Sequence, residues 1–436
     1  MNFGMANGRG RSLCSGMLAA ALFLGGGSAA LGSSPRSGMA AAAGTAERQA
    51  GSQVQAGQLI VALGDSITAG YEPGMTGTST PYGYVDRLQE QAWFHGRAEV
   101  ANYGVLGLTS GGLLNFVSAM KEGKAEVSAE EIQPGLSDPR IAAFAAGVAE
   151  AREKLERADV ITITIGGNDV TTLIADAKGM TEGQLKTKAA ELFGTYRANV
   201  ERAVSLITEI NPEALIVLAD QYQPVPKLAG ADLYKELNAA AASFTAVVDG
   251  LAGQFAAEGK AVQAAHVAEA FAGKELSLTH IFAEDVHPNQ AGYEAIAKVM
   301  AERIWGGYLE TAAQAGKAEI SVVVRGQELQ TPYPPVLKNG QTFVALKDLA
   351  DAVGGETGWD AKTGTATVAL GGVTVEIPIG AGQITANGVK LDTASPAFLH
   401  KVGKESKTYV PLAAVATGLG LDIQYSGKAK TAFINL

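Results

Sequence analysis

The stretch LIVALGDSITAG, residues 59–70, sets five consecutive apolar residues directly before a glycine, an aspartate and a serine. A short apolar run that ends in turn-forming residues predicts a buried β-strand. A serine on the turn that leaves such a strand can present its hydroxyl at the edge of the sheet, and Gly64 leaves room for a ligand there. Taken alone, Gly-Asp-Ser is also ordinary turn and helix-capping sequence. The ends of the other predicted strands therefore decide what it means.

The pattern of this strand recurs along residues 58–310. Further apolar runs predict four more strands, at residues 98–103, 160–165, 215–218 and 262–267. Helices are expected at residues 84–92, 140–157, 187–210, 233–258 and 290–305. Alternating strands and helices indicate a parallel sheet with helices on both faces, which is a three-layer α/β/α domain. Sites in such domains gather at the carboxyl ends of the strands.

Three further blocks carry residues suited to chemistry. Gly107, in NYGVLGLTS (102–110), can offer its backbone N–H to a developing negative charge because no side chain blocks the approach. Asn168, in ITIGGND (163–169), can donate its side-chain amide to the same charge. His287 follows two acidic residues closely and can act as an oriented base. Each block alone also fits a turn glycine, a helix cap or a surface histidine.

Together and in this order, Ser66, Gly107, Asn168 and His287 match the four residues that name the SGNH (GDSL-type) hydrolase superfamily, which residues 58–307 resemble. The likeness is greatest to the lipase/acylhydrolase branch. It implies a flavodoxin-like fold and a serine esterase with Ser66 as nucleophile and His287 as general base. It also implies an oxyanion hole made by the N–H groups of Ser66 and Gly107 and the side chain of Asn168, with neither a metal nor an organic cofactor.

The acid of the implied catalytic triad has two candidates. In the superfamily this residue normally lies three positions before the histidine, which is Glu284 here, whereas the aspartate, Asp285, lies two positions before it. The acid orients the imidazole and stabilises its charge, so either carboxylate serves if it reaches Nδ1 of His287. The residue type favours Asp285, and the spacing favours Glu284.

From about Glu319 the helical runs shorten, and a repeat with an offset of 66 residues becomes visible. The matching positions are Thr342, Val344, Leu346, Ala350, Gly354, Lys362, Thr365, Ala366 and Leu370 with Thr408, Val410, Leu412, Ala416, Gly420, Lys428, Thr431, Ala432 and Leu436. Trp359 and Tyr425 are equivalent aromatic residues. Each copy predicts a strand, a short helix, a glycine turn and two strands, which indicates a small α+β domain.

This C-terminal region, residues 318–436, resembles the stalk-like domain named after the copper amine oxidase N-terminal region, which many secreted proteins of Gram-positive bacteria carry. The resemblance rests on NGQTFVALKDLADAVGG (339–355), the tryptophan that follows it and the second copy. It implies a module for cell-surface attachment or spacing. Despite the domain's name no metal site is expected, because His400 is its only histidine.

The N-terminus has the order of a secretory signal. Two arginines precede a short apolar core at residues 17–24, and small residues follow it. We expect a signal peptide at 1–32, a flexible linker at 33–57 and a secreted or cell-surface protein. Cys14 is the only cysteine, so removal of the signal excludes disulfides and thiol catalysis in the mature chain.

The substrate and the partners are less defined. Acidic residues outnumber basic ones 44 to 34 without a long basic run, so neither nucleic acid nor an anionic membrane surface is favoured. A small-molecule, lipid or acylated-carbohydrate ester fits the predicted site, and deacetylation of a polysaccharide is the alternative reaction. A non-catalytic surface protein is a further alternative, although the four intact blocks argue against it. Acyl specificity depends on expected loops at 71–84, 117–138 and 171–187.

Overall fold

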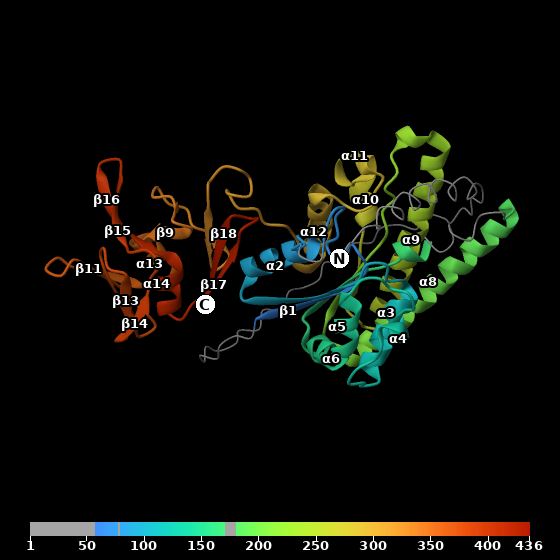
Figure 1. Ribbon diagram of the computed structural model, residues 1–436, viewed down its shortest axis with the longest axis horizontal. Coiled ribbons are helices and arrows are strands. Elements are labelled where there is room, and N and C mark those ends of the chain that lie inside the picture. The colour runs from blue at the N-terminus through green and yellow to red at the C-terminus, as the bar shows by residue number, and fades with distance from the viewer. Residues whose placement is uncertain (1–56, 77–78, 171–179) are drawn as a thin grey trace, which may run out of the picture.

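The computed structural model describes residues 57–76, 79–170 and 180–436. The expected signal peptide and, apart from Gly57, the expected linker lie outside these ranges. The described chain forms an α/β domain and, beside it, a C-terminal module built mostly of strands (Figure 1). Within the described ranges, no helix is long and apolar enough to cross a membrane.

A five-stranded sheet in the order β2-β1-β3-β4-β5 forms the centre of the α/β domain, and all its neighbouring strands are parallel. The strands are β1 (Gln58–Gly64), β2 (Ala98–Gly104), β3 (Val160–Thr164), β4 (Leu215–Ala219) and β5 (Val262–Ala265). The predicted parallel sheet is confirmed. Its last strand ends two residues before the predicted end, because Val267 already begins helix α10.

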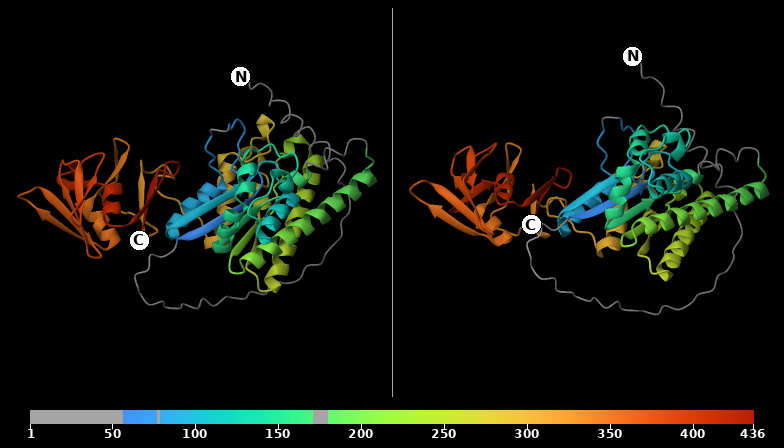
Figure 2. Two further views of the ribbon diagram at one scale, coloured as in Figure 1. Left: turned by 60° about the horizontal axis from the view of Figure 1, so that its bottom comes forward. Right: turned by 90° about the horizontal axis from the view of Figure 1, so that it is seen from below.

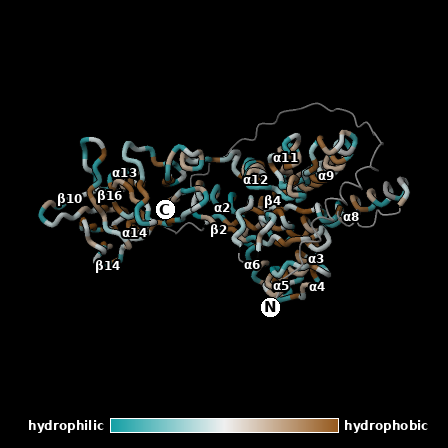
Figure 3. The backbone as a smooth tube through the Cα atoms, turned by 45° about the horizontal axis from the view of Figure 1, so that its top comes forward, coloured by the Kyte–Doolittle hydropathy of each residue, from teal (hydrophilic) through white to brown (hydrophobic). Residues whose placement is uncertain are grey.

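Helices cover both faces of this sheet, as Figure 2 shows. They are α2 (Tyr84–His95), α3 (Ser110–Lys121), α4 (Ala129–Ile132), α5 (Arg140–Ala146), α6 (Val148–Arg157), α8 (Glu182–Ile210), α9 (Ala231–Ala257), α10 (Val267–Phe271), α11 (Glu275–Leu278), α12 (Gln290–Trp305) and the 3-10 turns η2 (Lys227–Ala229) and η3 (Ile281–Ala283). Along β1, Val61 and Leu63 face the core under α3, α6, α8 and α9, whereas Ile60 and Ala62 face α2 and α12. The apolar segments, brown in Figure 3, gather between these layers. The three-layer α/β/α prediction is therefore confirmed.

Two sequence expectations about this domain were wrong in detail. Residues 140–157 form two helices in place of one, because the chain breaks at Gly147 between α5 and α6. The expected loop at 117–138 begins inside α3 and also contains α4. Residues 171–179 of the third expected loop lie outside the described ranges, and its last residues begin α8.

The C-terminal module contains three sheets, in the orders β10-β11-β12-β13-β14, β15-β16-β9-β8 and β17-β18-β6-β7. Its elements are β6 (Ser321–Val324), β7 (Gln327–Glu328), β8 (Val336–Lys338), β9 (Gln341–Ala345), α13 (Leu346–Val353), β10 (Glu356–Asp360), β11 (Thr365–Leu370), β12 (Val373–Pro378), β13 (Gln383–Ala386), β14 (Val389–Asp392), β15 (Phe398–Val402), β16 (Glu405–Pro411), α14 (Leu412–Gly418), β17 (Asp422–Ser426) and β18 (Thr431–Asn435). The sheets and two helices form the predicted α+β module.

The sequence repeat is visible in this module as β9-α13-β10-β11 and β16-α14-β17-β18. β9 and β16 pair antiparallel, and Val344 lies opposite its own repeat equivalent, Val410. Paired residues of antiparallel strands are related by a local twofold axis. The two copies therefore share an approximate twofold axis that passes between these two valines.

The module packs against α2 of the α/β domain. Phe433 is fully buried and contacts the rings of Trp93 and Phe94, with ring-centroid distances of 5.4 and 5.1 Å. Asn435 donates its side-chain amide to the backbone carbonyls of Trp93 and Gly96, at 3.1 and 3.0 Å. A module that served only as a spacer would not need this apolar contact. The contact holds the module against the α/β domain.

We expect Phe433→Ala to lower the free energy of unfolding by about 3–5 kcal/mol, because the substitution leaves a cavity between Trp93, Phe94 and the module. Thermal and urea denaturation measure the loss. Val389→Ala is the matched control, since Val389 is 63% exposed and its truncation should change stability by less than about 0.5 kcal/mol. A loss for Phe433→Ala no larger than that of the control would mean that the contact does not form in solution.

Candidate active site

Ser66 lies on the turn that follows β1, where the backbone is tightly constrained. Gly64 has a φ of 149°, and a Cβ there would lie 2.2 Å from the carbonyl oxygen of Thr164 on β3, so only glycine fits. Below the turn, the Thr68 hydroxyl lies 2.6 Å from the Thr164 hydroxyl and 3.0 Å from that of Tyr84. These buried contacts fix the turn on the sheet edge, as expected for a serine that must hold one orientation.

Three side chains form a continuous hydrogen-bonded series at this edge. The hydroxyl oxygen of Ser66 lies 2.9 Å from Nε2 of His287. Nδ1 of the same ring lies 2.7 Å from Oδ1 of Asp285. This oxygen also accepts the backbone N–H of His287 at 2.8 Å. The geometry is that of a nucleophile, a base and an acid that orients the base.

The two candidate acids are placed differently. Glu284 ends η3 in the left-handed conformation, with φ 57°, and its side chain is exposed. Asp285, one residue later, directs its carboxylate to the imidazole. Burial acts to raise the pKa of Asp285, but the hydrogen bonds and charge of His287 outweigh it and hold this pKa below its ordinary value. Asp285 is therefore ionised at neutral pH and lies where the acid of a triad has to lie.

The residues predicted for the oxyanion hole are placed as follows. Asn168 lines the same cavity as Ser66 and His287, and its amide nitrogen donates to the carbonyl oxygen of Leu108 at 2.9 Å. Gly107 lies on the turn after β2, with a φ of 84°, and the N–H of Val105, two residues earlier, donates to the carbonyl of Gly64. The structure thus joins the blocks after β1, β2 and β3, although Gly107 is not among the residues that line the cavity.

The cavity at Ser66 has a volume of about 150 Å³, and its lining includes residues that the sequence reasoning did not select. Gln221, Tyr222 and Pro224 come from the segment after β4. The Tyr222 hydroxyl donates to the carbonyl of Val286 at 2.9 Å and so holds the loop that carries His287. The sequence feature that could have identified these three residues is their position just after the carboxyl end of a predicted strand.

Two neighbours shape the electrostatics around the pair Ser66 and His287. The ring of Tyr71 meets the imidazole edge-on, with centroids 4.7 Å apart. Burial raises the pKa of Asp65 to about 7, so a large share of this carboxyl is uncharged at neutral pH. Asp285, whose pKa lies below its ordinary value, is therefore the more fully charged of these two carboxyl groups at neutral pH.

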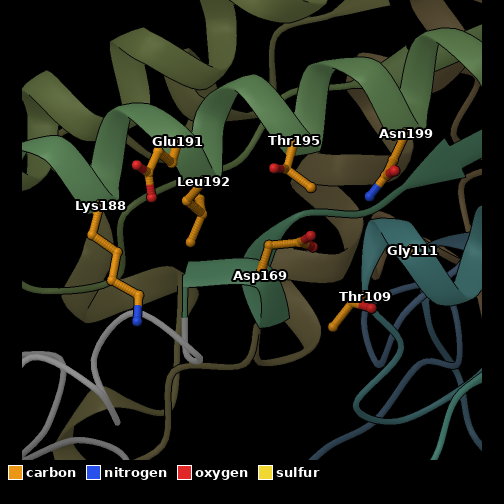
Figure 4. A pocket seen from close by; sticks show the side chains of 8 residues that line it. All are labelled: Thr109, Gly111, Asp169, Lys188, Glu191, Leu192, Thr195 and Asn199. Atoms are coloured by element: carbon orange, nitrogen blue, oxygen red, sulfur yellow. The ribbon is translucent and has the colours of Figure 1, made fainter.

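A larger and more polar cavity, of about 340 Å³, has Asp169 in its lining (Figure 4). Its lining consists of Thr109, Gly111, Asp169, Lys188, Glu191, Leu192, Thr195 and Asn199. Asp169 follows Asn168 directly and accepts hydrogen bonds from the backbone N–H and the hydroxyl of Ser110, at 3.0 and 2.5 Å. The α8 side chains point toward the same space, which therefore offers further hydrogen-bonding groups.

No group of three or more His, Cys, Asp or Glu side chains in the described ranges is arranged to hold a metal ion. His280 contacts Glu72, with 3.1 Å between Nε2 and Oε1, and His95 stacks on Trp305. Both histidines thus have structural contacts in the fold.

Comparison with known families agrees with the fold. Residues 60–300 match the GDSL-like lipase/acylhydrolase family, and residues 323–434 match the copper amine oxidase N-terminal domain. Because the first match covers more than half of the chain, the protein belongs to the GDSL-like lipase/acylhydrolase family, whose members hydrolyse esters. The resemblance inferred from the sequence is confirmed for both regions.

Several solved structures are similar to the α/β domain. The lipase Lip_vut3 from a goat rumen metagenome is 20% identical, with a TM-score of 0.38, and the match covers 58% of this chain and 98% of that one. TesA is 19% identical, with 57% and 99% covered and a TM-score of 0.34. A family 3 carbohydrate esterase of Clostridium thermocellum is 18% identical, with 57% and 94% covered and a TM-score of 0.32. No curated protein matches the chain.

Proposed function

We propose that the protein is a secreted carboxylic ester hydrolase that works through an acyl-enzyme on Ser66. The observation that carries the proposal is the hydrogen-bonded series Ser66, His287 and Asp285, with distances of 2.9 and 2.7 Å. Secretion is proposed from the signal-like order of residues 1–32, and surface attachment from the C-terminal module.

The first half of the reaction acylates the serine. The Ser66 oxygen attacks the ester carbonyl while its proton passes to Nε2 of His287. The resulting oxyanion is held by the N–H groups of Ser66 and Gly107 and by the amide of Asn168. When the carbon–oxygen bond to the alcohol breaks, the imidazolium returns the proton to the leaving alcohol. Asp285 stabilises the imidazolium in between.

The second half releases the acid. A water molecule gives a proton to His287 and attacks the acyl carbonyl, and the Ser66 oxygen leaves with that proton. His287 is sufficient for every proton transfer in these two reaction steps. The free serine and the carboxylic acid are the products.

The proposal is tested with the purified chain from residue 33 onward. A fluorophosphonate probe should label Ser66, identified by peptide mass spectrometry, and p-nitrophenyl acetate and butyrate should be hydrolysed. Both results are expected of an activated serine, and a chain that neither reacts with the probe nor hydrolyses any ester in a panel of acyl lengths would refute the proposal.

Deacetylation of a carbohydrate is a second candidate reaction of the same site. The cavity lined by Asp169 favours it, because Glu191, Thr195 and Asn199 offer hydrogen bonds to hydroxyl groups of an alcohol part. Comparing kcat/KM on acetylated xylo-oligosaccharides with that on p-nitrophenyl esters of longer acids separates the candidates. A higher kcat/KM on the long acyl esters would exclude carbohydrate deacetylation as the main reaction.

We expect Asn168→Ala to lower kcat by about 10²- to 10³-fold, the usual effect of removing one oxyanion donor. The measurement is steady-state hydrolysis of a p-nitrophenyl ester. Asn238→Ala is the control, because Asn238 also donates its amide to a backbone carbonyl, that of Tyr234 on α9, but does not line the cavity. Equal rates for both variants would remove Asn168 from the oxyanion hole.

A further inference from the structure

The C-terminal module contains two clefts that are copies of each other. The Trp359 cleft, of about 470 Å³, lies between the start of α13, β10 and the incoming strand β16. The Tyr425 cleft, of about 310 Å³, lies between the start of α14, β17 and the incoming strand β9. Each is therefore bounded by the same three elements, taken from opposite copies of the repeat.

The correspondence extends to single residues. Every residue lining one cleft has a counterpart 66 positions away in the other, except Tyr333 and Asp348 in the first cleft and Leu337 in the second. The approximate twofold axis between Val344 and Val410 relates the two clefts. A pocket that arose only from loose packing would have no reason to recur in this way, since the two repeats share only part of their residues.

Each cleft has an exposed aromatic ring at its edge. Trp359 is 52% exposed and Tyr425 is 54% exposed, and both lie on edge strands of their sheets. Large aromatic side chains are normally buried for their apolar area, and an exposed one beside a concavity marks a surface that contacts something. Equivalent positions in both repeats thus keep a ring where the fold does not use it for packing.

Polar side chains lie among apolar ones in both clefts, and charged side chains line only the Trp359 cleft. The Trp359 cleft adds Lys347, Asp348, Ser406 and Lys407, and the Tyr425 cleft adds Gln341, Gln424 and Thr342. An aromatic face with donors and acceptors around it complements a sugar ring, which has apolar C–H faces and a rim of hydroxyl groups. The net charge of −10 disfavours nucleic acid as the occupant.

We propose that the two clefts bind an extended polysaccharide, each holding a separate segment against its aromatic ring. The duplication suits a polymer because an insoluble polysaccharide presents the same unit many times. Two weak sites on one chain then retain the protein far better than one site does, because the second contact is intramolecular. The module would thereby hold the α/β domain on a polymeric matrix.

The test is a depletion-binding assay with the purified chain from residue 33 onward on four insoluble polymers: xylan, microcrystalline cellulose, chitin and peptidoglycan sacculi. We expect saturable retention on at least one of them. Trp359→Ala and Tyr425→Ala should each weaken retention by at least about tenfold, and the double variant should not be retained. Trp359→Phe and Tyr425→Phe, which keep an aromatic face, should restore most of the binding.

Leu399→Ala is the matched control, because Leu399 is 58% exposed on the same module but lines neither cleft. Hydrolysis of a soluble ester should be the same in all these variants, so a failure of binding is distinguishable from a failure of the proposed hydrolase function. Retention on none of the four polymers, or equal retention of the double variant and the unchanged chain, would overturn the proposal. Binding of a proline-rich peptide without retention on any polymer would assign the clefts to peptides and overturn it as well.

Discussion

Ser66→Ala should reduce kcat/KM for a p-nitrophenyl ester by up to about 10⁶-fold, the largest effect that we expect of any single substitution in this chain. The hydroxyl oxygen of Ser66 lies 2.9 Å from Nε2 of His287, so its removal takes away both the attacking atom and the partner of the base. The variant retains the oxyanion donors, and about 10³- to 10⁴-fold acceleration over water can therefore survive. Single-turnover and steady-state assays measure the loss.

The control for this substitution is Ser243→Ala. Its hydroxyl is exposed on α9 and donates only to the carbonyl of Ala239 within the same helix. We expect unchanged kinetics and labelling for it, whereas Ser66→Ala should lose reaction with the fluorophosphonate altogether. Full activity of Ser66→Ala would mean that another group attacks the ester, and the proposed acyl-enzyme would have to be abandoned.

Local patterns were enough to predict most of the α/β domain. The three inner strands β1, β3 and β4 are buried on both sides, so their apolar runs are continuous and stand out from the amphipathic helices between them. The break in the helix at 140–157 was missed because Gly147 is tolerated inside many helices, and only packing decides that α5 and α6 part there. The segment containing α3 was missed because its first turn is rich in glycine and serine.

The sequence was enough to predict the motifs that form the site, but not the contacts between their side chains. The positions of Ser66, Asn168 and His287 follow from strand ends and short motifs. The contribution of Tyr222 depends on where β4 lies in the strand order, beside β3, which the sequence does not state. Likewise, the repeat was visible in the sequence, whereas the pairing of β9 with β16 and the clefts on either side of it needed the fold.

The choice between Glu284 and Asp285 shows why spacing alone is a weak guide. The two carboxylates are neighbours in the sequence, and the left-handed backbone at Glu284 turns the chain so that only the second of them reaches the imidazole. Oδ1 of Asp285 then accepts two hydrogen bonds from His287, one from Nδ1 and one from the backbone N–H. The short side chain of aspartate makes this possible.

We therefore expect Asp285→Asn to lower kcat by about 10⁴-fold, the size of this substitution in other serine hydrolases with a triad. The amide removes the negative charge that stabilises the imidazolium, and its NH₂ group, when turned toward Nδ1, favours the tautomer in which Nε2 cannot accept the serine proton. Binding contacts to the substrate are unchanged, so KM should change far less than kcat.

Glu284→Gln removes one carboxylate charge from the adjacent residue and is the matched control. Because the Glu284 side chain is exposed, we expect kcat within about twofold of the unchanged chain, in line with the weak coupling of solvated charges. A large loss in Glu284→Gln together with full activity in Asp285→Asn would make Glu284 the acid and would require the loop of residues 284–287 to rearrange when substrate binds. Full activity in both variants would mean that His287 is oriented without a carboxylate, by contacts such as those with the Tyr71 ring and the Ser66 hydroxyl.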